Sequence, residues 1–248
     1  MSDTDMNEFE IGSGFGFSGQ IIDELEASEY TLATIALDMS GSVGGFSDQL
    51  KAMLEEVIGA CARSPYSQNL LIRVIEFSSK YKNGVNEIHG FKALSEIDIN
   101  GYPDLRPGGM TPLNDGLYSG VGAANAYAQQ LVDLDFAVNG ITFAISDGGE
   151  NASVATTTMV KDELESSVTG EIMESHYSVL IGVGSGGGGV SGILKDYQDA
   201  TGIDQFIWAG DATASKLAKL AQFVSQSISS TSQALGTGGA SQNISATI

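Results

Sequence analysis

Oxygen-bearing side chains follow an apolar run near the start of the chain, in the segment Asp38-Met39-Ser40-Gly41-Ser42. Asp38, Ser40 and Ser42 alternate along a turn, so their side chains can converge on one point. A hard divalent cation such as Mg²⁺ prefers six oxygen ligands in near-octahedral array and accepts hydroxyls and waters beside carboxylates. The segment therefore suits a cation site, and the alternative is that Ser40 or Ser42 caps a helix beginning near residue 45.

Two later segments carry the same kind of oxygen ligand. Thr111 lies in Gly108-Gly109-Met110-Thr111-Pro112-Leu113, and Asp147 lies in Ile145-Ser146-Asp147-Gly148. A further hydroxyl and a further carboxylate would complete a mixed ligand set of the type that Mg²⁺ tolerates. Whether they can meet the first group depends on the elements that carry them.

Short apolar runs alternate with amphipathic segments along most of the chain. This alternation predicts an α/β fold with a doubly wound, mostly parallel sheet, flanked by helices on both faces and connected by right-handed crossovers. The expected strands cover residues 30–38, 70–77, 85–91, 140–146, 177–184 and 205–209, and the expected helices cover residues 46–63, 112–134, 157–169, 193–200 and 213–229.

The ligand site of an open parallel sheet lies outside the carboxyl ends of its strands, at the point where the strand order switches. Applied to the expected strands, this rule selects the loops 38–45, 106–114, 147–151 and 182–189. The first three loops contain the oxygen-bearing residues, so we expect the fold to bring those residues together.

The two ends of the chain differ in composition from its centre. Residues 1–29 are acidic and contain glycine, whereas residues 233–248 are rich in Ser, Gly, Thr, Asn and Gln and lack a periodic apolar face. We expect an N-terminal arm over residues 1–29, a single domain over residues 30–232 and a flexible tail over residues 233–248.

The combination of a D-x-S-x-S loop, a later Thr and a later Asp resembles the metal-ion-dependent adhesion site (MIDAS) of von Willebrand factor A (VWA) domains. The likeness covers about residues 30–230 and implies the doubly wound, Rossmann-like fold of that family. By this resemblance, five residues occupy all of the site positions: Asp38, Ser40, Ser42, Thr111 and Asp147.

Two stretches resemble particular branches of the family. The sequence Gly-Gly-Met-Thr-Pro-Leu-Asn-Asp-Gly-Leu at 108–117 is similar to the bacterial cytoplasmic branch. The stretch 221–229, which is followed by a Ser/Gly tail, is similar to the Y-type proteins of tellurium-resistance clusters. This resemblance implies a place in a stress-response or tellurium-resistance-type complex.

The family resemblance implies metal-dependent protein binding. The five residues would hold a divalent cation, Mg²⁺ or else Mn²⁺ or Ca²⁺, with one coordination position open. An ion with few direct carboxylate ligands remains strongly electrophilic, so it can take an Asp or Glu of a partner protein as its last ligand. The alternative is a structural subunit of a larger assembly, in which the metal only stabilises the domain.

The charge balance excludes several classes of partner. With 31 acidic and 11 basic side chains, the formal net charge is -20. Binding to phosphate backbones depends on Lys and Arg, so we expect no binding to nucleic acid and none to membranes. A single cysteine, Cys61, and a start without a basic region before an apolar run indicate a cytoplasmic protein. The sequence leaves the oligomeric state open.

A phosphotransfer interpretation of the first loop is weaker, and we expect no enzymatic activity. Aspartyl-phosphate enzymes also place a carboxylate after a first strand, beside Mg²⁺. They usually carry a second acid two residues on, where this chain has Ser40, and no Lys closely follows Asp147. His89 and His176 are the only histidines, and we interpret both as structural.

The glycine pattern of dinucleotide sites, G-x-G-x-x-G, occurs at 14–19 and at 182–187. That pattern needs a strand before it and a helix after it. The first occurrence lacks the strand. The second follows an expected strand, but its extra glycines favour a mobile loop over a tight phosphate-binding turn.

Overall fold

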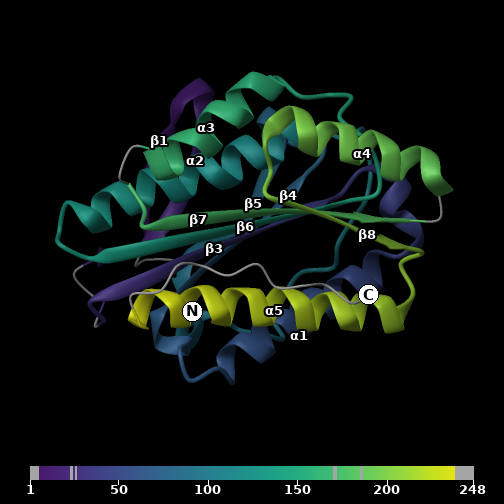
Figure 1. Ribbon diagram of the computed structural model, residues 1–248. Helices are drawn as coiled ribbons and strands as arrows, with labels where there is room; N and C mark the ends of the chain where they lie inside the picture. The colour runs from purple at the N-terminus through teal and green to yellow at the C-terminus, as the bar shows by residue number, and fades with distance from the viewer. Residues whose placement is uncertain (1–5, 23–24, 26, 170–171, 185–186, 238–248) are drawn as a thin grey trace.

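The computed structural model of the chain describes residues 6–22, 25, 27–169, 172–184 and 187–237. These residues form an eight-stranded sheet with the strand order β1-β2-β5-β4-β3-β6-β7-β8. Helices cover both of its faces (Figure 1). The strand pairs are parallel except β1 with β2 and β4 with β5, so the expected α/β fold with a doubly wound, mostly parallel sheet is confirmed.

Strands and helices alternate along the chain after an initial hairpin. The strands are β1 (Met6–Ile11), β2 (Phe15–Gln20), β3 (Glu29–Asp38), β4 (Leu70–Phe77), β5 (Val85–Ala93), β6 (Ala137–Ser146), β7 (Ser175–Val183) and β8 (Gln205–Gly210). The helices are α1 (Ser47–Ala62), α2 (Leu113–Val132), α3 (Thr157–Thr169), α4 (Gly187–Thr201) and α5 (Ala214–Thr237). α4 begins before its expected start at residue 193 because its first turn consists of glycines, which carry no apolar pattern.

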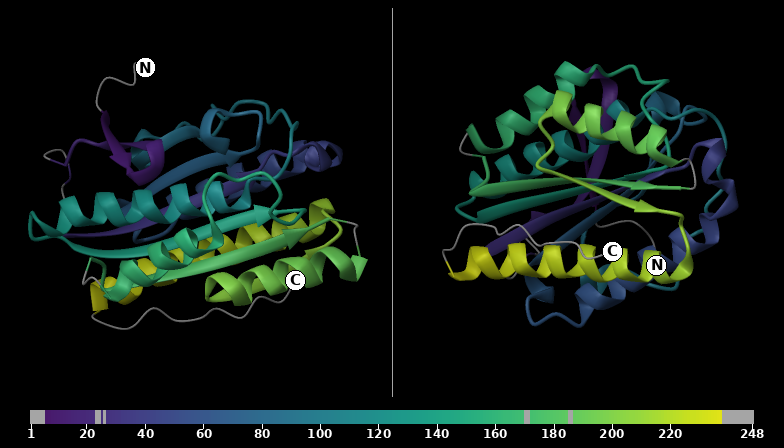
Figure 2. Two further views of the ribbon diagram at one scale, coloured as in Figure 1. Left: turned by 90° about the horizontal axis from the view of Figure 1, so that it is seen from above. Right: turned by 45° about the vertical axis from the view of Figure 1, so that its right-hand side comes forward.

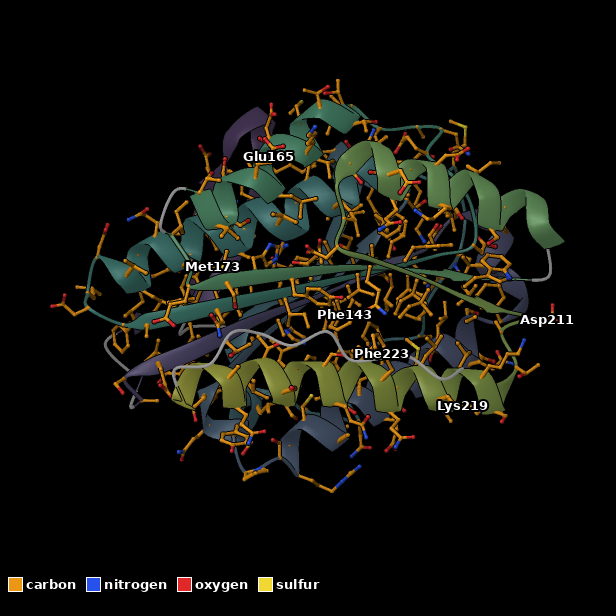
Figure 3. The ribbon with its side chains drawn as sticks, in the orientation of Figure 1. Phe143, Glu165, Met173, Asp211, Lys219 and Phe223 are labelled. Carbon is orange, nitrogen blue, oxygen red and sulfur yellow. The ribbon has the colours of Figure 1, made fainter. Side chains whose placement is uncertain are left out.

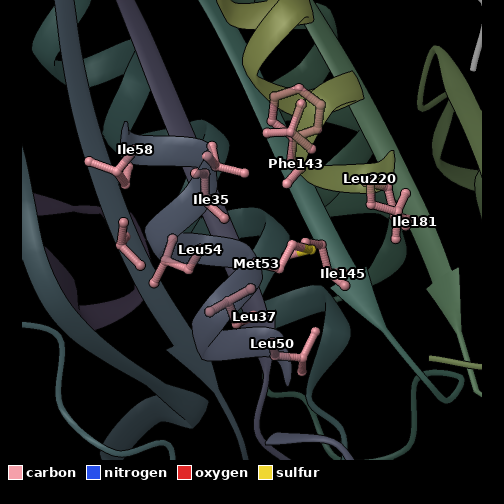
Figure 4. Packing of buried hydrophobic residues seen from close by; sticks show 14 of the residues in the cluster. Ile35, Leu37, Leu50, Met53, Leu54, Ile58, Phe143, Ile145, Ile181 and Leu220 are labelled. Carbon is pink, nitrogen blue, oxygen red and sulfur yellow. The ribbon is translucent and has the colours of Figure 1, made fainter. Parts of the chain in front are cut away.

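The central strand β3 is buried on both faces, which is typical of parallel strands covered by helices. Leu32 and Ala36 belong to the core on the α2 side, whereas Ile35 and Leu37 belong to the core shared with α1 and α5. Figure 4 shows Leu37 in the same cluster as Leu50 of α1. Because both faces are buried, the strand is a mainly aliphatic and β-branched run, with Thr31 and Thr34 among its buried residues, and could be recognised in the sequence.

The helices form one layer on each face of the sheet. α1 and α5 lie side by side on one face, and α2, α3 and α4 cover the other (Figures 1 and 2). Phe143 of β6 points toward α5, and its ring packs edge-on against Phe223 with 6.3 Å between the ring centroids (Figure 3). The two cores on either side of the sheet hold β3, β4 and β6 in place beneath the loops that follow them.

Residues 6–20, which the sequence predicts to be part of an arm, form two strands of the sheet. β1 and β2 pair antiparallel, and β2 lies beside β5. The rings of Phe9 and Phe17 stack at 4.9 Å between centroids, and Phe17 also packs edge-on against Tyr127 of α2. Glycines between these aromatic residues hid the strand pattern. Gly19 is required in its position because a Cβ there would stand 2.9 Å from the Tyr127 ring.

A buried arginine connects this hairpin to the rest of the sheet. The Nε of Arg73 in β4 donates a 2.6 Å hydrogen bond to the carboxylate of Glu87 in β5. The two terminal nitrogens of Arg73 donate to the carbonyl and the hydroxyl of Ser119 in α2. The same Glu87 carboxylate accepts hydrogen bonds from the amide and the hydroxyl of Ser18 in β2. One ion pair therefore joins three strands and a helix.

The end of the described chain is helical for longer than the sequence predicts. α5 continues to Thr237, past residue 233 where the tail was expected to begin, and buries Thr231 and Ser232. The rest of the expected tail, residues 238–248, lies outside the described residues, as do residues 1–5 of the expected arm. Within the described ranges, no helix combines the length and apolar character that a membrane span needs.

Candidate metal centre

The strand order of the sheet switches at β3. The chain passes from β3 through α1 to β4 on one side, and later returns through α2 to β6 on the other side. β3 is parallel to both neighbours, so the carboxyl ends of these strands share one edge of the sheet, which we call the carboxyl edge. Asp38 ends β3 and Ser146 ends β6. The loops after both strands therefore lie where the strand order predicts a ligand site.

Hydrogen bonds join four of the five predicted ligands. The Asp38 carboxylate accepts a 2.8 Å hydrogen bond from the amide of Ser40. The hydroxyl oxygens of Ser40 and Ser42 lie 3.0 Å apart. The Ser42 hydroxyl donates a 2.7 Å hydrogen bond to Oδ1 of Asp147, which is 105 residues away in the chain. The structure thus brings these four residues together at the carboxyl edge.

Thr111, the fifth predicted ligand, lies against the loop that begins with Asp147. Its amide donates a 2.8 Å hydrogen bond to the side-chain oxygen of Asn151. Its carbonyl accepts a 3.1 Å hydrogen bond from the amide of the same residue. Its hydroxyl oxygen also approaches Gly148, where an added Cβ would stand 3.6 Å from that oxygen. Thr111 therefore lies next to the residue that follows Asp147, at the same edge as the other four residues.

Backbone hydrogen bonds hold two of the site loops together. The amide of Gly108 donates to the carbonyl of Met39 at 2.9 Å, and the amide of Gly41 donates to the carbonyl of Gly109 at 3.0 Å. Gly109 has a φ of +79°, and an added Cβ there would stand 2.8 Å from the Ser78 hydroxyl. Glycine is therefore needed at this position, for backbone conformation and for space.

The glycine-rich loop after β7 reaches the same edge. Gly184 has a φ of +121°, and an added Cβ there would stand 3.4 Å from the Cβ of Asp147. This dinucleotide-like pattern runs from β7 into the start of α4 at Gly187, and its residues 185–186 lie outside the described residues. The other occurrence, at 14–19, lies in the hairpin and not between a strand and a helix.

The site is buried at its base and open on one side. Asp38 is 1% exposed, Ser40 is 2% exposed and Thr111 is 4% exposed, whereas Ser42 is exposed and Asp147 is half-buried. Burial raises the pKa of Asp38 to about 6, although hydrogen bonds to its oxygens act in the opposite direction. Burial also raises the pKa of Asp147. No ion pair among the described residues includes either carboxylate, so a bound cation would stabilise both.

The oxygen spacing suits a small divalent cation. In an octahedron with metal-oxygen distances of about 2.0–2.1 Å, neighbouring ligand oxygens lie roughly 2.8–3.0 Å apart. The Ser40 and Ser42 oxygens are 3.0 Å apart, and those of Ser42 and Asp147 are 2.7 Å apart. Both are hydrogen-bond distances close to this spacing, so a cation could bind these oxygens with small movements. In the described part of the chain, no group of three or more His, Cys, Asp or Glu side chains could hold a metal ion. A cation here would therefore depend on hydroxyl ligands beside the two carboxylates.

Ser40 and Ser42 do not act as helix caps. A short 3-10 helix (Gly41–Gly45) begins directly after Ser40, and α1 follows it. Neither start has a side-chain cap hydrogen bond. The two hydroxyls instead contact each other and Asp147, so the capping alternative is wrong.

Sequence reasoning missed the residue that orients Asp38. The Ser146 hydroxyl donates a 2.5 Å hydrogen bond to Oδ2 of Asp38. The Ser146 oxygen in turn accepts a 3.2 Å hydrogen bond from the amide of Gly148. The available signal was a hydroxyl directly before Asp147, at the last position of a buried strand.

Two further carboxylates hold the loop that follows β6. Glu150 accepts hydrogen bonds from the amides of Ser153 and Asn114. Asp115, which is 1% exposed, accepts one from the amide of Ala155. Because Asn114 and Asp115 lie in the first turn of α2, these bonds fix the loop against the start of that helix. No sequence pattern indicated this connection.

Comparisons with known proteins extend these observations. None of the protein-family models compared with the sequence matches it, and no curated protein does. Solved structures do match. The pilus adhesin SpaC from Lactobacillus rhamnosus GG, in its open conformation, has 13% sequence identity and a TM-score of 0.62, over 87% of this chain and 31% of that chain.

A second protein with a similar structure is proximal thread matrix protein 1 (PTMP1) from the mussel byssus. It has 16% identity and a TM-score of 0.54, over 84% of this chain and 47% of that chain. Another PTMP1 structure, described as having a zinc-occupied MIDAS motif, has 15% identity and a TM-score of 0.52, over 82% of this chain and 46% of that chain.

These likenesses show that the chain has a VWA-like α/β fold. The chain spans about a third of the length of SpaC and just under half of the length of PTMP1. At this level of identity the likeness concerns the fold.

Proposed function

We propose that this chain is a metal-dependent protein interaction module. Its candidate ligands for a divalent cation are Asp38, Ser40, Ser42, Thr111 and Asp147. The observation that carries the proposal is the contact of Ser42 with Asp147, which places oxygens from two distant loops at ligand spacing above a buried carboxylate. The zinc-occupied MIDAS motif of PTMP1 supports a divalent cation on this fold.

The ligand set favours one more anionic ligand. Three of the five oxygens come from neutral hydroxyls, so a bound divalent cation keeps a strong attraction for a carboxylate. Ser42 and Asp147 lie on the accessible side of the site, where the Asp or Glu of a partner protein would approach. Mg²⁺ is the first candidate because every donor is an oxygen, with Mn²⁺ and Ca²⁺ as alternatives.

A second candidate function is that of a structural subunit. In that case the cation would only hold the loops after β3 and β6 together, and other surfaces would make the contacts of an assembly. The hydrogen bonds of Ser42 with Asp147 and of Ser146 with Asp38 already join these loops, which favours a stabilising function for a cation bound between them. The two functions differ in whether partner binding needs the metal.

We also propose that the site is not catalytic. Ser40 stands where an aspartyl-phosphate enzyme would carry its second acid. The two histidines are engaged within the fold: the ring of His89 lies 2.9 Å from the Tyr102 hydroxyl, and that of His176 lies 3.0 Å from the Thr142 hydroxyl. Neither is among the candidate ligands.

A cytoplasmic location and a place in a stress-response or tellurium-resistance-type complex are predictions of the sequence resemblance alone. The matched structures include a pilus adhesin and a protein of the mussel byssus, so the fold does not specify the compartment. Fractionation of cells that produce the chain, followed by immunodetection, tests the location.

Metal binding is tested by titrating Mg²⁺, Mn²⁺, Ca²⁺ and Zn²⁺ separately into EDTA-treated and dialysed protein. We expect heat of binding and a higher melting temperature, because a ligand that binds only the native state stabilises it by mass action. Asp147→Asn should remove both effects. Asp162→Asn, on the exposed side of α3, should keep both effects. Wild-type protein that gives neither heat nor a thermal shift would exclude the metal site.

Partner binding is tested by capture with the immobilised full chain in Mg²⁺ and in EDTA. The proposal predicts that Mg²⁺-dependent capture is lost in Asp38→Ala while circular dichroism shows a retained fold. A partner bound equally well in EDTA, or by a folded Asp38→Ala, would favour the structural subunit instead.

A further inference from the structure

The surface around the candidate metal centre carries exposed apolar side chains. Met110, directly before Thr111, is 56% exposed, and Ile193 of α4 is 55% exposed. The side chain of Ile193 lies over Gly149, where an added Cβ would stand 2.5 Å from its Cγ2. Gly149 is two residues after Asp147, so Ile193 of α4 lies beside the loop after β6. Met110 lies in the loop before α2, which carries Thr111.

Exposed apolar side chains are unevenly distributed over the surface, and most of them lie toward the carboxyl edge. The described residues include five large hydrophobic side chains that are classed as exposed: Met110, Leu134, Val154, Val168 and Ile193. Three of them lie toward the carboxyl edge: Met110 in the loop before α2, Val154 in the loop after β6, and Ile193 on α4 over Gly149. Leu134 and Val168 lie at the ends of α2 and α3 that lead into β6 and β7, at the opposite edge.

Two cations, Lys80 and Arg106, lie at the loop that carries Met110. Positive charge is scarce in this chain, which has 11 Lys and Arg against 31 Asp and Glu. The Lys80 ammonium donates a hydrogen bond to the carbonyl of Arg106. The Lys80 side chain also covers Gly108, where an added Cβ would stand 3.8 Å from its Cδ. Gly108 is itself bonded to Met39, between Asp38 and Ser40.

Several cations of the described residues form ion pairs, and Lys82, Lys216 and Lys219, like Lys80 and Arg106, form none. Lys80 and Arg106 differ from these three in lying beside the loop that bonds to Met39. Lys51, Arg63, Lys161 and Lys195 all form ion pairs with carboxylates. Among the described residues, neither Lys80 nor Arg106 is in an ion pair, and both side chains are exposed. Positive charge is therefore available next to the candidate metal centre, on a surface that is otherwise acidic.

Resting on the proposed function, we propose that the partner binds through an acidic-apolar segment. Its central Asp or Glu binds the metal, apolar side chains flanking it pack against Met110 on one side and Ile193 on the other, and a second acidic side chain pairs with Lys80 and Arg106. A charged centre with an apolar surround is a common arrangement of interface hot spots, because the apolar contacts exclude water from the central interaction. The cations also guide an acidic segment toward the site despite the negative net charge.

The proposal is tested with a displayed library of short peptides that share a fixed central Glu and are random elsewhere. The library is selected on the immobilised full chain in Mg²⁺, and binders that remain bound in EDTA are discarded. We expect the retained peptides to be enriched in large apolar residues and in a second Asp or Glu near the central Glu.

Variants then locate the contacts of one retained peptide by fluorescence anisotropy. Met110→Ser and Ile193→Ser should each weaken binding roughly tenfold, or about 1.4 kcal/mol, because each variant loses an apolar contact that keeps water from the central carboxylate. The matched control is Leu134→Ser, whose side chain is 54% exposed at the opposite edge. It should have no effect.

The charge contacts are measured in the same way. The double variant Lys80→Glu and Arg106→Glu should weaken binding several-fold at low ionic strength and remove most of its dependence on salt. Lys219→Glu, on the outer side of α5, is the control and should behave as wild type. Calorimetric Mg²⁺ affinity should be unchanged in the apolar variants.

The outcomes separate this proposal from the proposed function. Peptides that need Mg²⁺ but show no apolar or second acidic preference would overturn the acidic-apolar partner while leaving metal-dependent capture intact. Mg²⁺ binding without any Mg²⁺-dependent peptide would overturn both the partner and the capture function, and leave only a metal-stabilised domain.

Discussion

Ser146 and Asp38, 108 residues apart in the chain, share a 2.5 Å hydrogen bond from the serine hydroxyl to Oδ2 of the carboxylate. The other carboxylate oxygen of Asp38 accepts a hydrogen bond from the amide of Ser40. These two bonds fix the plane of a carboxylate that is 1% exposed. The last residue of β6 therefore sets the orientation of the last residue of β3, at the base of the candidate metal centre.

Removing the Ser146 hydroxyl should weaken metal binding without removing a proposed ligand. Partners that orient metal ligands typically contribute 10–100-fold to affinity, so Ser146→Ala should raise the Mn²⁺ dissociation constant by about that factor. Calorimetry measures it. The control is Ser178→Ala in β7, which also removes a buried hydroxyl bonded to a carboxylate, that of Asp204. Equal metal affinity in Ser146→Ala and wild type would refute the orienting function.

The core of the fold could be predicted from the sequence because its strands and helices carry strong periodic signals. The buried strands β3 and β4 consist mainly of aliphatic residues, with Thr in β3 and Arg73 and Glu76 in β4, and α1 buries residues at helical spacing, such as Leu50, Leu54 and Ile58. The hairpin at residues 6–20 gave a weaker signal, since its aromatic residues alternate with glycines and acids. Its place in the sheet depends on distant partners, including Tyr127, that no local pattern indicates.

The candidate site was predictable where it depends on residue type and chain order. Asp38, Thr111 and Asp147 each follow or precede an element whose end could be located, so their meeting at one edge follows from the parallel sheet. The connection of Glu150 to the first turn of α2 could not be predicted. Such a bond depends on how closely the helix approaches the loop, which is decided by side-chain packing.

Two glycines on one face of α2 should respond oppositely to alanine. An added Cβ at Gly116 would stand 2.7 Å from the ring of Phe77, which is fully buried, whereas one at Gly120 would stand 3.4 Å from the methyl groups of Thr34 and Thr142. We expect Gly116→Ala to lower the free energy of unfolding by about 1–3 kcal/mol through overpacking. Gly120→Ala should be neutral or stabilising by up to about 1 kcal/mol through helix propensity.

Urea unfolding of the two glycine variants measures both effects. If Gly116→Ala were as stable as Gly120→Ala, α2 would not be in close contact with the end of β4. The start of α2 would then have room to move relative to the loop that carries Thr111.

The buried ion pair of Arg73 and Glu87 should be important for the stability of the hairpin. Arg73→Ala leaves Glu87 without its cation and the Ser119 carbonyl without its donor, so we expect a loss of about 3–5 kcal/mol in urea unfolding. The control is Arg63→Ala, which breaks a pair whose side chains are 67% and 61% exposed. It should cost less than about 1 kcal/mol.

Limited proteolysis gives a second readout for this ion pair. The variant that lacks the Arg73 side chain should be cleaved within residues 6–20 faster than wild type, because Glu87 also holds Ser18. Equal costs for the Arg73 and Arg63 variants, with no change in cleavage, would contradict this connection of the hairpin to the sheet.

The buried histidines should lower the stability of the metal-free protein in mild acid, whereas Asp38, whose pKa burial raises to about 6, acts in the opposite direction. Burial lowers the pKa of His176 from 6.5 to about 4, although Asp204 acts in the opposite direction. Because the pKa in the folded state is the lower one, the neutral ring stabilises the fold above pH 6.5. That contribution is lost as the pH falls through 6.5 to about 4. It amounts to at most roughly 3 kcal/mol.

His176→Gln should remove this part of the pH dependence. Wild-type protein should lose more unfolding free energy between pH 7 and pH 4 than the variant, in urea titrations with EDTA present. His89, whose pKa burial also lowers to about 4, keeps its own contribution in that variant, so the double variant with His89→Gln should lose the least unfolding free energy between pH 7 and pH 4. Parallel curves for wild type and both variants would show that these rings titrate alike in the folded and unfolded chain.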